Sequence, residues 1–237
     1  MDNFIEGFRI DHSQISKDSY VNRIESLKSI DEIKFKSPIT FFVGENGSGK
    51  STLLEAIAEA YGFNKEGGSK NYNFSTFKEN SDLKDAIVLY KGYKKAQYSY
   101  FFRAETFFNV ASMEVEYAKN SPTPSQEYHN KSHGEGFISL FKKLSESKGL
   151  YLMDEPEAAL SPQKQLSLFS LIYDAASKGS QFIIISHSPI LLAIPNSEIY
   201  SFDDNKIQKC KYEDTQSYKI TKSFIEHKDL MIKELID

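Results

Sequence analysis

The chain has 237 residues, 40% of them hydrophobic, which is enough to bury one substantial core, so we expect a single domain. A formal net charge of −4 excludes a protein that grips nucleic acid by overall charge, although a local basic patch stays open. One cysteine excludes an internal disulfide framework and is typical of the reducing cytoplasm, and no apolar run approaches the ~20 residues of a membrane helix. The acidic, polar start is unlike a signal peptide. We therefore predict a cytoplasmic protein without membrane insertion.

The N-terminal part of the chain contains strand-like segments followed by one helix. Residues 8–10 and 33–35 have the composition of strands, and residues 39–43 form a continuous β-branched and aromatic run typical of a buried strand. After a glycine-rich turn, residues 51–61 place apolar side chains on one helical stripe, which ends at Gly62. These patterns predict a strand–turn–helix unit.

The middle of the chain alternates polar loops with short regular segments. The expected elements are strands at 87–90 and 98–102 that form a hairpin about Gly92, a helix near 107–117 and a helix from about 134 to 144. The intervening polar stretches have no regular pattern. We predict one domain over residues 1–237, with an inserted or helical subdomain at about 63–145.

The last third returns to a regular alternation of strands and helices. The expected elements are strands at 150–153 and 182–185, a helix between Ser161 and Gly179, a hairpin of 199–202 with 206–210, and a helix from Thr215 onward. Because strands alternate with helices, we predict an α/β fold with a mainly parallel sheet flanked by helices and an antiparallel β addition.

The glycine-rich turn after residues 39–43 carries the clearest chemical signal. It matches the eight-residue P-loop pattern and lies between a strand and a helix, as that pattern requires. Glycines let backbone N–H groups turn toward a triphosphate, and the helix N-terminus adds positive charge. We expect Lys50 to bridge the β- and γ-phosphates, Ser51 to coordinate Mg²⁺ and Thr52 to help bind the α-phosphate. The predicted ATP-binding residues are Gly44, Glu45, Asn46, Gly47, Ser48, Gly49, Lys50, Ser51 and Thr52.

Two acids follow directly after the apolar residues 150–153. Asp154 is predicted to hold Mg²⁺, directly or through water, and Glu155 to polarise the attacking water. An apolar strand that ends in acids is common by itself, but its place downstream of a P-loop favours the catalytic interpretation. Glu157 is expected to be a solvated acid without a role.

With these motifs in place, the chain resembles the ABC ATPase superfamily, which implies the P-loop NTPase fold of ABC type. Residues 132–136, Ser-His-Gly-Glu-Gly, are similar to the ABC signature, although His133 replaces the usual Gly and Glu135 the usual Gln. A Ser hydroxyl and a Gly amide at a helix N-terminus form an anion site. The resemblance therefore implies that Ser132 and Gly134 bind a nucleotide held by another subunit.

Two more segments extend the resemblance in the expected order. Residues 158–161 resemble the D-loop, which crosses the dimer interface in this superfamily, and His187 is similar to the switch histidine that contacts the γ-phosphate. The usual Gln between the P-loop and the signature has no clear counterpart. Glu105 is the best-placed candidate for it, and Gln97 is a second. No aromatic residue is assigned to stack on adenine.

Asp154-Glu155-Pro156-Glu157 is more similar to non-transport members of the superfamily than to transporters. These members are the RecF, SMC and overcoming-lysogenization-defect groups and, with the greatest similarity, small stand-alone bacterial predicted ATPases. The resemblance implies a homodimer that sandwiches ATP with Mg²⁺ and drives a process through an unidentified protein or nucleic-acid partner. Two alternatives stay open: the ATP-binding subunit of an ABC transporter, and an ATPase associated with DNA repair or phage defence.

Overall fold

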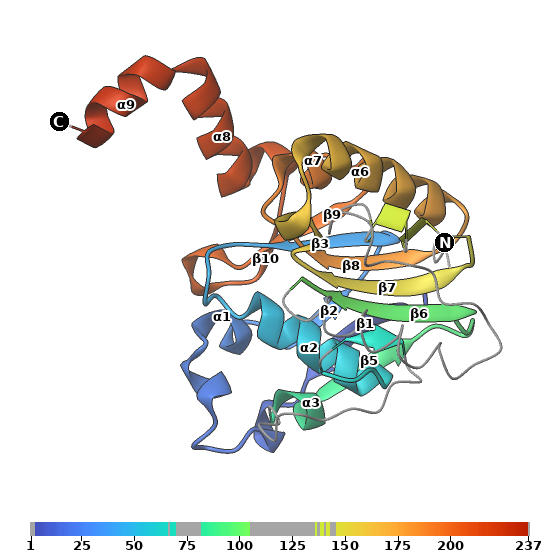
Figure 1. Ribbon diagram of the computed structural model, residues 1–237. Coiled ribbons are helices and arrows are strands. Elements are labelled where there is room, and N and C mark those ends of the chain that lie inside the picture. Colours follow the sequence, from blue (N-terminus) through green and yellow to red (C-terminus); the bar gives the residue numbers. More distant parts are fainter. Residues whose placement is uncertain are drawn as a thin grey trace.

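Two β-sheets and the helices between and around them make up the protein (Figure 1). The computed structural model describes residues 3–65, 67–69, 82–104, 136, 138, 139, 141, 142 and 146–236. The predicted helix near 107–117 lies outside these residues, and the described residues of the predicted 134–144 helix are helical. The single domain over 1–237, with its subdomain at about 63–145, stays a prediction.

The larger sheet has seven strands in the order β10-β9-β3-β8-β7-β6-β4. The strands are β3 (Ile39–Val43), β4 (Gly68–Ser69), β6 (Tyr98–Arg103), β7 (Gly149–Asp154), β8 (Gln181–Ile185), β9 (Glu198–Ser201) and β10 (Gln208–Cys210). Its five central strands are parallel, whereas β10 and β4 pair antiparallel at the edges. The predicted mainly parallel sheet with antiparallel additions is thus confirmed, as is the hairpin of β9 and β10.

Both faces of this sheet are covered, which explains why its central strands are almost uniformly apolar. The helices are α1 (Glu25–Lys28), α2 (Lys50–Tyr61), α3 (Leu83–Ala86), α6 (Pro162–Ser177), α7 (Pro189–Leu192), α8 (Gln216–Glu226) and α9 (Lys228–Ile236). Phe41 and Ile184 pack on the side of α6 and α7, while the neighbouring Phe42 and Ile183 pack on the side of α2. This alternation buries a separate core on each face of the sheet, and Figure 1 shows α6 and α7 on one face and α2 on the other.

The smaller sheet lies beyond α2 and is antiparallel, with the order β2-β1-β5 (Figure 1). Its strands are β1 (Ile5–Ile10), β2 (Glu32–Lys34) and β5 (Ile87–Lys91). The buried side chain of Gln181 joins the two sheets, because its Oε1 accepts from the Ile5 amide at 2.9 Å and its Nε2 donates to the Ile5 carbonyl at 2.7 Å. The smaller sheet is therefore fixed to the first residue of β8.

The predicted hairpin of 87–90 with 98–102 is wrong. β5 pairs with β1 in the smaller sheet, whereas β6 pairs with β7 in the larger one. Gly92 turns the chain beside Asn3, whose carbonyl oxygen would lie 2.0 Å from a Cβ at this position. The apolar side chains of β5 and β6 pack in different sheets, and the local sequence does not show which sheet each strand joins.

The C-terminal residues form two helices that extend away from the sheets, as predicted from Thr215 onward (Figure 1). Several large apolar side chains of these helices are exposed, among them Ile225 and Leu235. Short 3₁₀ turns connect other elements: η1 (His12–Gln14), η2 (Tyr20–Arg23), η4 (Pro156–Ala159), η5 (Asp203–Asn205) and η6 (Tyr212–Asp214). In the part of the chain that the structure describes, no helix combines the length and apolar content that crossing a bilayer requires.

Candidate functional site

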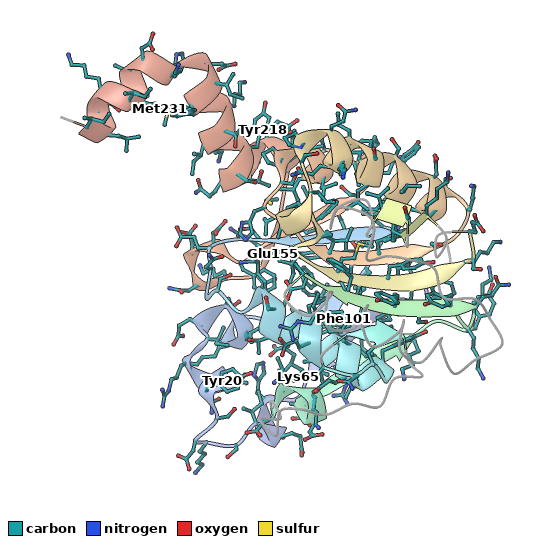
Figure 2. All side chains as sticks on the ribbon, in the orientation of Figure 1. Tyr20, Lys65, Phe101, Glu155, Tyr218 and Met231 are labelled. Carbon is teal, nitrogen blue, oxygen red and sulfur yellow. The ribbon has the colours of Figure 1, made fainter. Side chains whose placement is uncertain are left out.

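The carboxyl ends of three adjacent strands bring the sequence motifs together. β3, β8 and β7 are parallel neighbours, so the segments that follow them emerge at one edge of the sheet. These segments are the P-loop after β3, the acids at the end of β7 and His187 after β8. Figure 2 labels Glu155, which marks this edge among the surrounding side chains.

The P-loop is shaped by left-handed backbone conformations and by supporting side chains behind it. Gly44, Gly47 and Gly49 have φ of 137°, 80° and 96°, and Gly49 caps the N-terminus of α2. A Cβ on Gly49 would lie 2.6 Å from the Ile24 side chain, so another residue would be strained by both backbone and contact. Ser26 Oγ also donates to the Ser48 carbonyl at 2.5 Å. The segment around α1 thus forms the wall behind the loop.

The Lys50 ammonium is held within the loop. Its Nζ donates to the carbonyls of Gly44 and Glu45, both at 2.7 Å, and the residue is buried. Burial lowers the pKa of Lys50, whereas the nearby carboxylates of Glu155 and Asp154 raise it. A cation desolvated in this way interacts strongly with an anion that approaches the loop.

Ser51 and Asp154 face each other from α2 and β7. Ser51 Oγ donates to Asp154 Oδ1 at 3.4 Å, and Asp154 is buried. Burial raises the pKa of Asp154 to about 6, against the lowering effect of the Arg103 guanidinium. A hydroxyl and a carboxylate among further acids are the oxygen ligands that Mg²⁺ prefers, so these residues fit the predicted metal site.

Glu155 and His187 form the outer part of the site. His187 Nε2 lies 3.7 Å from Glu155 Oε1, and both side chains are more than one-third exposed. Glu155 has φ 49° and ψ 55°, a conformation that costs a non-glycine residue about 1–3 kcal/mol. With Glu45 and Asn46, these two residues line an open depression of about 520 Å³. The depression leaves room for water and a phosphate group beside the carboxylate.

The remaining predicted site residues have mixed outcomes. Thr52 lies half-buried in the first turn of α2. Ser132, Gly134 and Glu105 lie outside the described residues, so their roles stay predictions. Gln97 precedes β6 and therefore lies at the opposite edge of the parallel sheet, roughly 20 Å of strand from this site. The proposal that Gln97 replaces the usual Gln is wrong for this reason.

Two residues of the site were missed or misjudged from the sequence. Arg103 ends β6 beside Asp154, with its Nε 4.0 Å from Asp154 Oδ2 and its Nη2 2.9 Å from Glu55 Oε1. A basic residue at the carboxyl end of a strand next to the acidic strand is the signal that could have identified it. Glu157, expected to be solvated, instead carries a carboxylate that accepts from Ser186 Oγ at 2.9 Å and from the His187 amide at 2.5 Å.

Replacing Asp154 should stabilise the protein in the absence of nucleotide and metal. Because the folded-state pKa of about 6 is above the ordinary aspartate pKa of 3.8, ionised Asp154 destabilises the fold at high pH, and this cost disappears as the pH falls from 6 to below 4. At pH 8 we expect Asp154→Asn to raise the free energy of unfolding by on the order of 2 kcal/mol, which corresponds to a rise of roughly 4–8 °C in Tm. The gain should shrink by more than half at pH 4.5.

The measurement is thermal unfolding in EDTA at the two pH values, with Asp174→Asn as the control. Asp174 lies on the exposed side of α6, so its replacement should leave Tm nearly unchanged. An Asp154→Asn variant that is less stable than the parent at pH 8 would contradict the predicted burial cost.

Comparison with known proteins gives matches along most of the chain. The AAA_23 family, described as an AAA domain, matches residues 21–234. A xylose import ATP-binding protein, XylG of Moorella thermoacetica, is 25% identical over 89% of this chain and 47% of its own length. A lipoprotein-releasing system ATP-binding protein, LolD of Buchnera aphidicola subsp. Schizaphis graminum, is 24% identical over 77% of this chain and 93% of its own.

The similar proteins differ in length and in structural likeness. The chain spans only 36%, 47% and 36% of three sugar-import relatives, two XylG proteins and one AraG. Among solved structures, the SMC head domain from Thermotoga maritima is 16% identical, covers 87% of this chain and 98% of its own, and has a TM-score of 0.46. That structural likeness is too distant to bear on fold or function.

Proposed function

Because the chain belongs to the AAA_23 family and is an ABC-class P-loop ATPase, we propose that it hydrolyses ATP with Mg²⁺ at the edge where β3, β7 and β8 end. The observation that carries the proposal is the convergence of three chemical groups there. Lys50 lies within the P-loop, Asp154 lies 3.4 Å from Ser51, and Glu155 lies 3.7 Å from His187. A cytoplasmic location belongs to the same proposal, since ATP is the substrate.

Binding of the triphosphate would depend on the P-loop amides and on Lys50. The loop wraps the first turn of α2, whose N-terminal end favours anions, and the Lys50 ammonium already lies between the Gly44 and Glu45 carbonyls. Phosphate oxygens of the β- and γ-groups would add to the contacts of this ammonium. Charge-assisted hydrogen bonds of this kind are about twice as strong as neutral ones.

Ser51 and Asp154 would hold the magnesium ion. Mg²⁺ bound with ATP supplies positive charge that offsets the charge of the phosphates. That charge would favour ionised Asp154, whose pKa is raised first by burial and then by the neighbouring carboxylates of Glu155 and Glu55. Burial makes the ionised carboxylate energetically unfavourable, and a bound divalent cation would offset that desolvation cost.

Glu155 would act as the general base. It would accept a proton from water as the water oxygen bonds to the γ-phosphorus, while the bond from that phosphorus to the β–γ bridging oxygen breaks and ADP departs with the electron pair. His187 would donate a hydrogen bond to the γ-phosphate. The 3.7 Å between Glu155 and His187 lets both side chains reach one phosphate and one water.

A complete site would need a second copy of the chain. In the proposed head-to-tail homodimer, Ser132 and Gly134 of one copy would contact the nucleotide bound to Lys50 of the other. Hydrolysis would separate the copies, so that ATP acts as a switch for a partner process. The transporter relatives favour one alternative, in which this dimer drives a membrane transporter. Capture of a membrane protein by the ATP-bound protein would support that alternative.

ATP should double the solution mass of a variant that binds but does not hydrolyse it. We expect Glu155→Gln to be monomeric without nucleotide and dimeric with Mg²⁺-ATP, because the sandwich persists when turnover stops. Light scattering coupled to size exclusion measures this change. The control is Lys50→Ala combined with Glu155→Gln, which should stay monomeric. A monomer under every nucleotide condition would rule out the sandwich.

A further inference from the structure

The carboxylate of Glu157 connects the turn after Glu155 with the loop that carries His187. One oxygen, Oε1, accepts from Ser186 Oγ at 2.9 Å and from the main-chain amide of His187 at 2.5 Å. The other oxygen, Oε2, is shielded from solvent, and among the described residues it has no hydrogen-bond partner. Removing this second carboxylate oxygen from water without a hydrogen-bond partner costs free energy.

These two bonds belong to a ring of hydrogen bonds that joins the loop after β8 to the segment of Glu157, directly and through Gln165 of α6. The Ser188 amide donates to Ser186 Oγ at 3.1 Å, and Ser188 Oγ donates to Gln165 Oε1 at 2.6 Å. Gln165 Nε2 in turn donates to the carbonyl of Leu160 at 3.1 Å, which returns the ring to the segment of Glu157. The loop after β8 is therefore tied at two points to the segment between β7 and α6.

Burying the Glu157 carboxylate is energetically unfavourable, which indicates that its hydrogen bonds have a role beyond connecting the two loops. Burial raises the pKa of Glu157, and the neighbouring Glu155 carboxylate raises it further, while the bonds from the His187 amide and Ser186 lower it. A neutral side chain at this position would avoid the repulsion between two acids. The bonds to the loop of His187 offset that repulsion.

We propose that Glu157 is a positioning residue that fixes His187 relative to Glu155, a role that rests on the proposed ATP hydrolysis. Its carboxylate accepts from the main-chain amide of His187, so it fixes the backbone position from which the imidazole side chain extends. The ring through Ser188 and Gln165 sets the direction in which the loop leaves β8. Displacement of a reacting group by 1 Å can cost about 100-fold in rate.

The test is a double-mutant cycle in steady-state ATP hydrolysis. We expect Glu157→Ala to lower kcat by about 10- to 100-fold, with KM for ATP changed by less than about twofold. Glu157→Gln keeps an oxygen that can accept both bonds, so it should recover most of the lost kcat. The variant that combines Glu157→Ala with His187→Ala should be no slower than His187→Ala alone, because Glu157 acts through His187.

Glu198→Ala is the matched control. Glu198 also accepts from the main-chain amide of another loop, Lys36, at 2.9 Å, but it begins β9 at the opposite edge of the sheet. Its loss should lower Tm and leave kcat unchanged. If Glu157→Ala does not fold, Ser186→Ala removes one bond of the ring and replaces it in the cycle.

The outcomes separate this proposal from the one on which it rests. Absence of Mg²⁺-ATP turnover in the parent would overturn both. Turnover in the parent combined with an unchanged kcat in Glu157→Ala would overturn the positioning role alone. Losses that multiply in the double variant would do the same, since they would mean that Glu157 and His187 act independently.

Discussion

Lys50→Ala should abolish ATP turnover and weaken ATP binding on the order of 100-fold. The substitution removes the cation that the P-loop holds between two of its own carbonyls, and with it the charge-assisted bonds to the phosphates. Each hydrogen bond to a charged group contributes about 1.5–3 kcal/mol, so the loss of two at the lower end of this range, about 3 kcal/mol, corresponds to the expected effect. Isothermal titration with Mg²⁺-ATP measures the affinity, and phosphate release measures turnover.

The control for this substitution is Lys209→Ala. Lys209 pairs with Glu198 at 2.6 Å and lies over the Tyr200 ring, so it is as well defined as Lys50 but belongs to β10. We expect its removal to leave ATP affinity unchanged. ATP binding by Lys50→Ala at the affinity of the parent would contradict the assignment of the phosphate site.

Glu155→Gln should separate binding from hydrolysis. Loss of the proposed general base should lower turnover by about 10²- to 10⁴-fold, whereas the proposed phosphate contacts come from the P-loop and Lys50 and not from this side chain. We therefore expect single-turnover phosphate release to fall by that factor while the dissociation constant for Mg²⁺-ATP changes by less than about threefold. Gln is close to Glu in shape, so the strained backbone at this position should be preserved.

An exposed acid on α8 supplies the comparison for Glu155→Gln. Glu226→Gln makes the same chemical change far from the sheet edge and should leave both quantities at the values of the parent. If Glu155→Gln hydrolysed ATP at the parent rate, another group would have to be the base. Asp154 would then be the first candidate, because burial raises its pKa to about 6.

The parts of the fold and site that could be predicted from the sequence depend on local patterns. Residues 39–62 give a strand, a loop and a helix within one short window, and the structure has β3, the P-loop and α2 there. Asp154 ends the apolar strand β7, and Glu155 and His187 lie within two residues of the ends of β7 and β8, so parallel pairing was enough to bring them together. In each case the sequence pattern and the structural element that it predicts lie within the same short segment.

The parts that could not be predicted depend on contacts between distant residues. β5 and β6 are close in sequence, but they join different sheets because their apolar faces match different cores. Arg103 and Glu157 acquire their surroundings from Glu55 and from the loop after β8, which lie 48 and about 30 residues away. Their chemistry becomes visible only when these partners are in place.

The wall behind the P-loop has a consequence for how such sites are identified and handled. Ile24, Ser26 and Leu27 face Gly49 and Ser48 from a segment that ends before the phosphate motif begins. A fragment that starts at β3 would keep all eight motif residues. It would lack the side chains of Ile24, Ser26 and Leu27, which pack against the P-loop backbone. The conformation of the proposed phosphate loop thus depends in part on side chains about 20 residues upstream, in a stretch that carries no recognisable signature of its own.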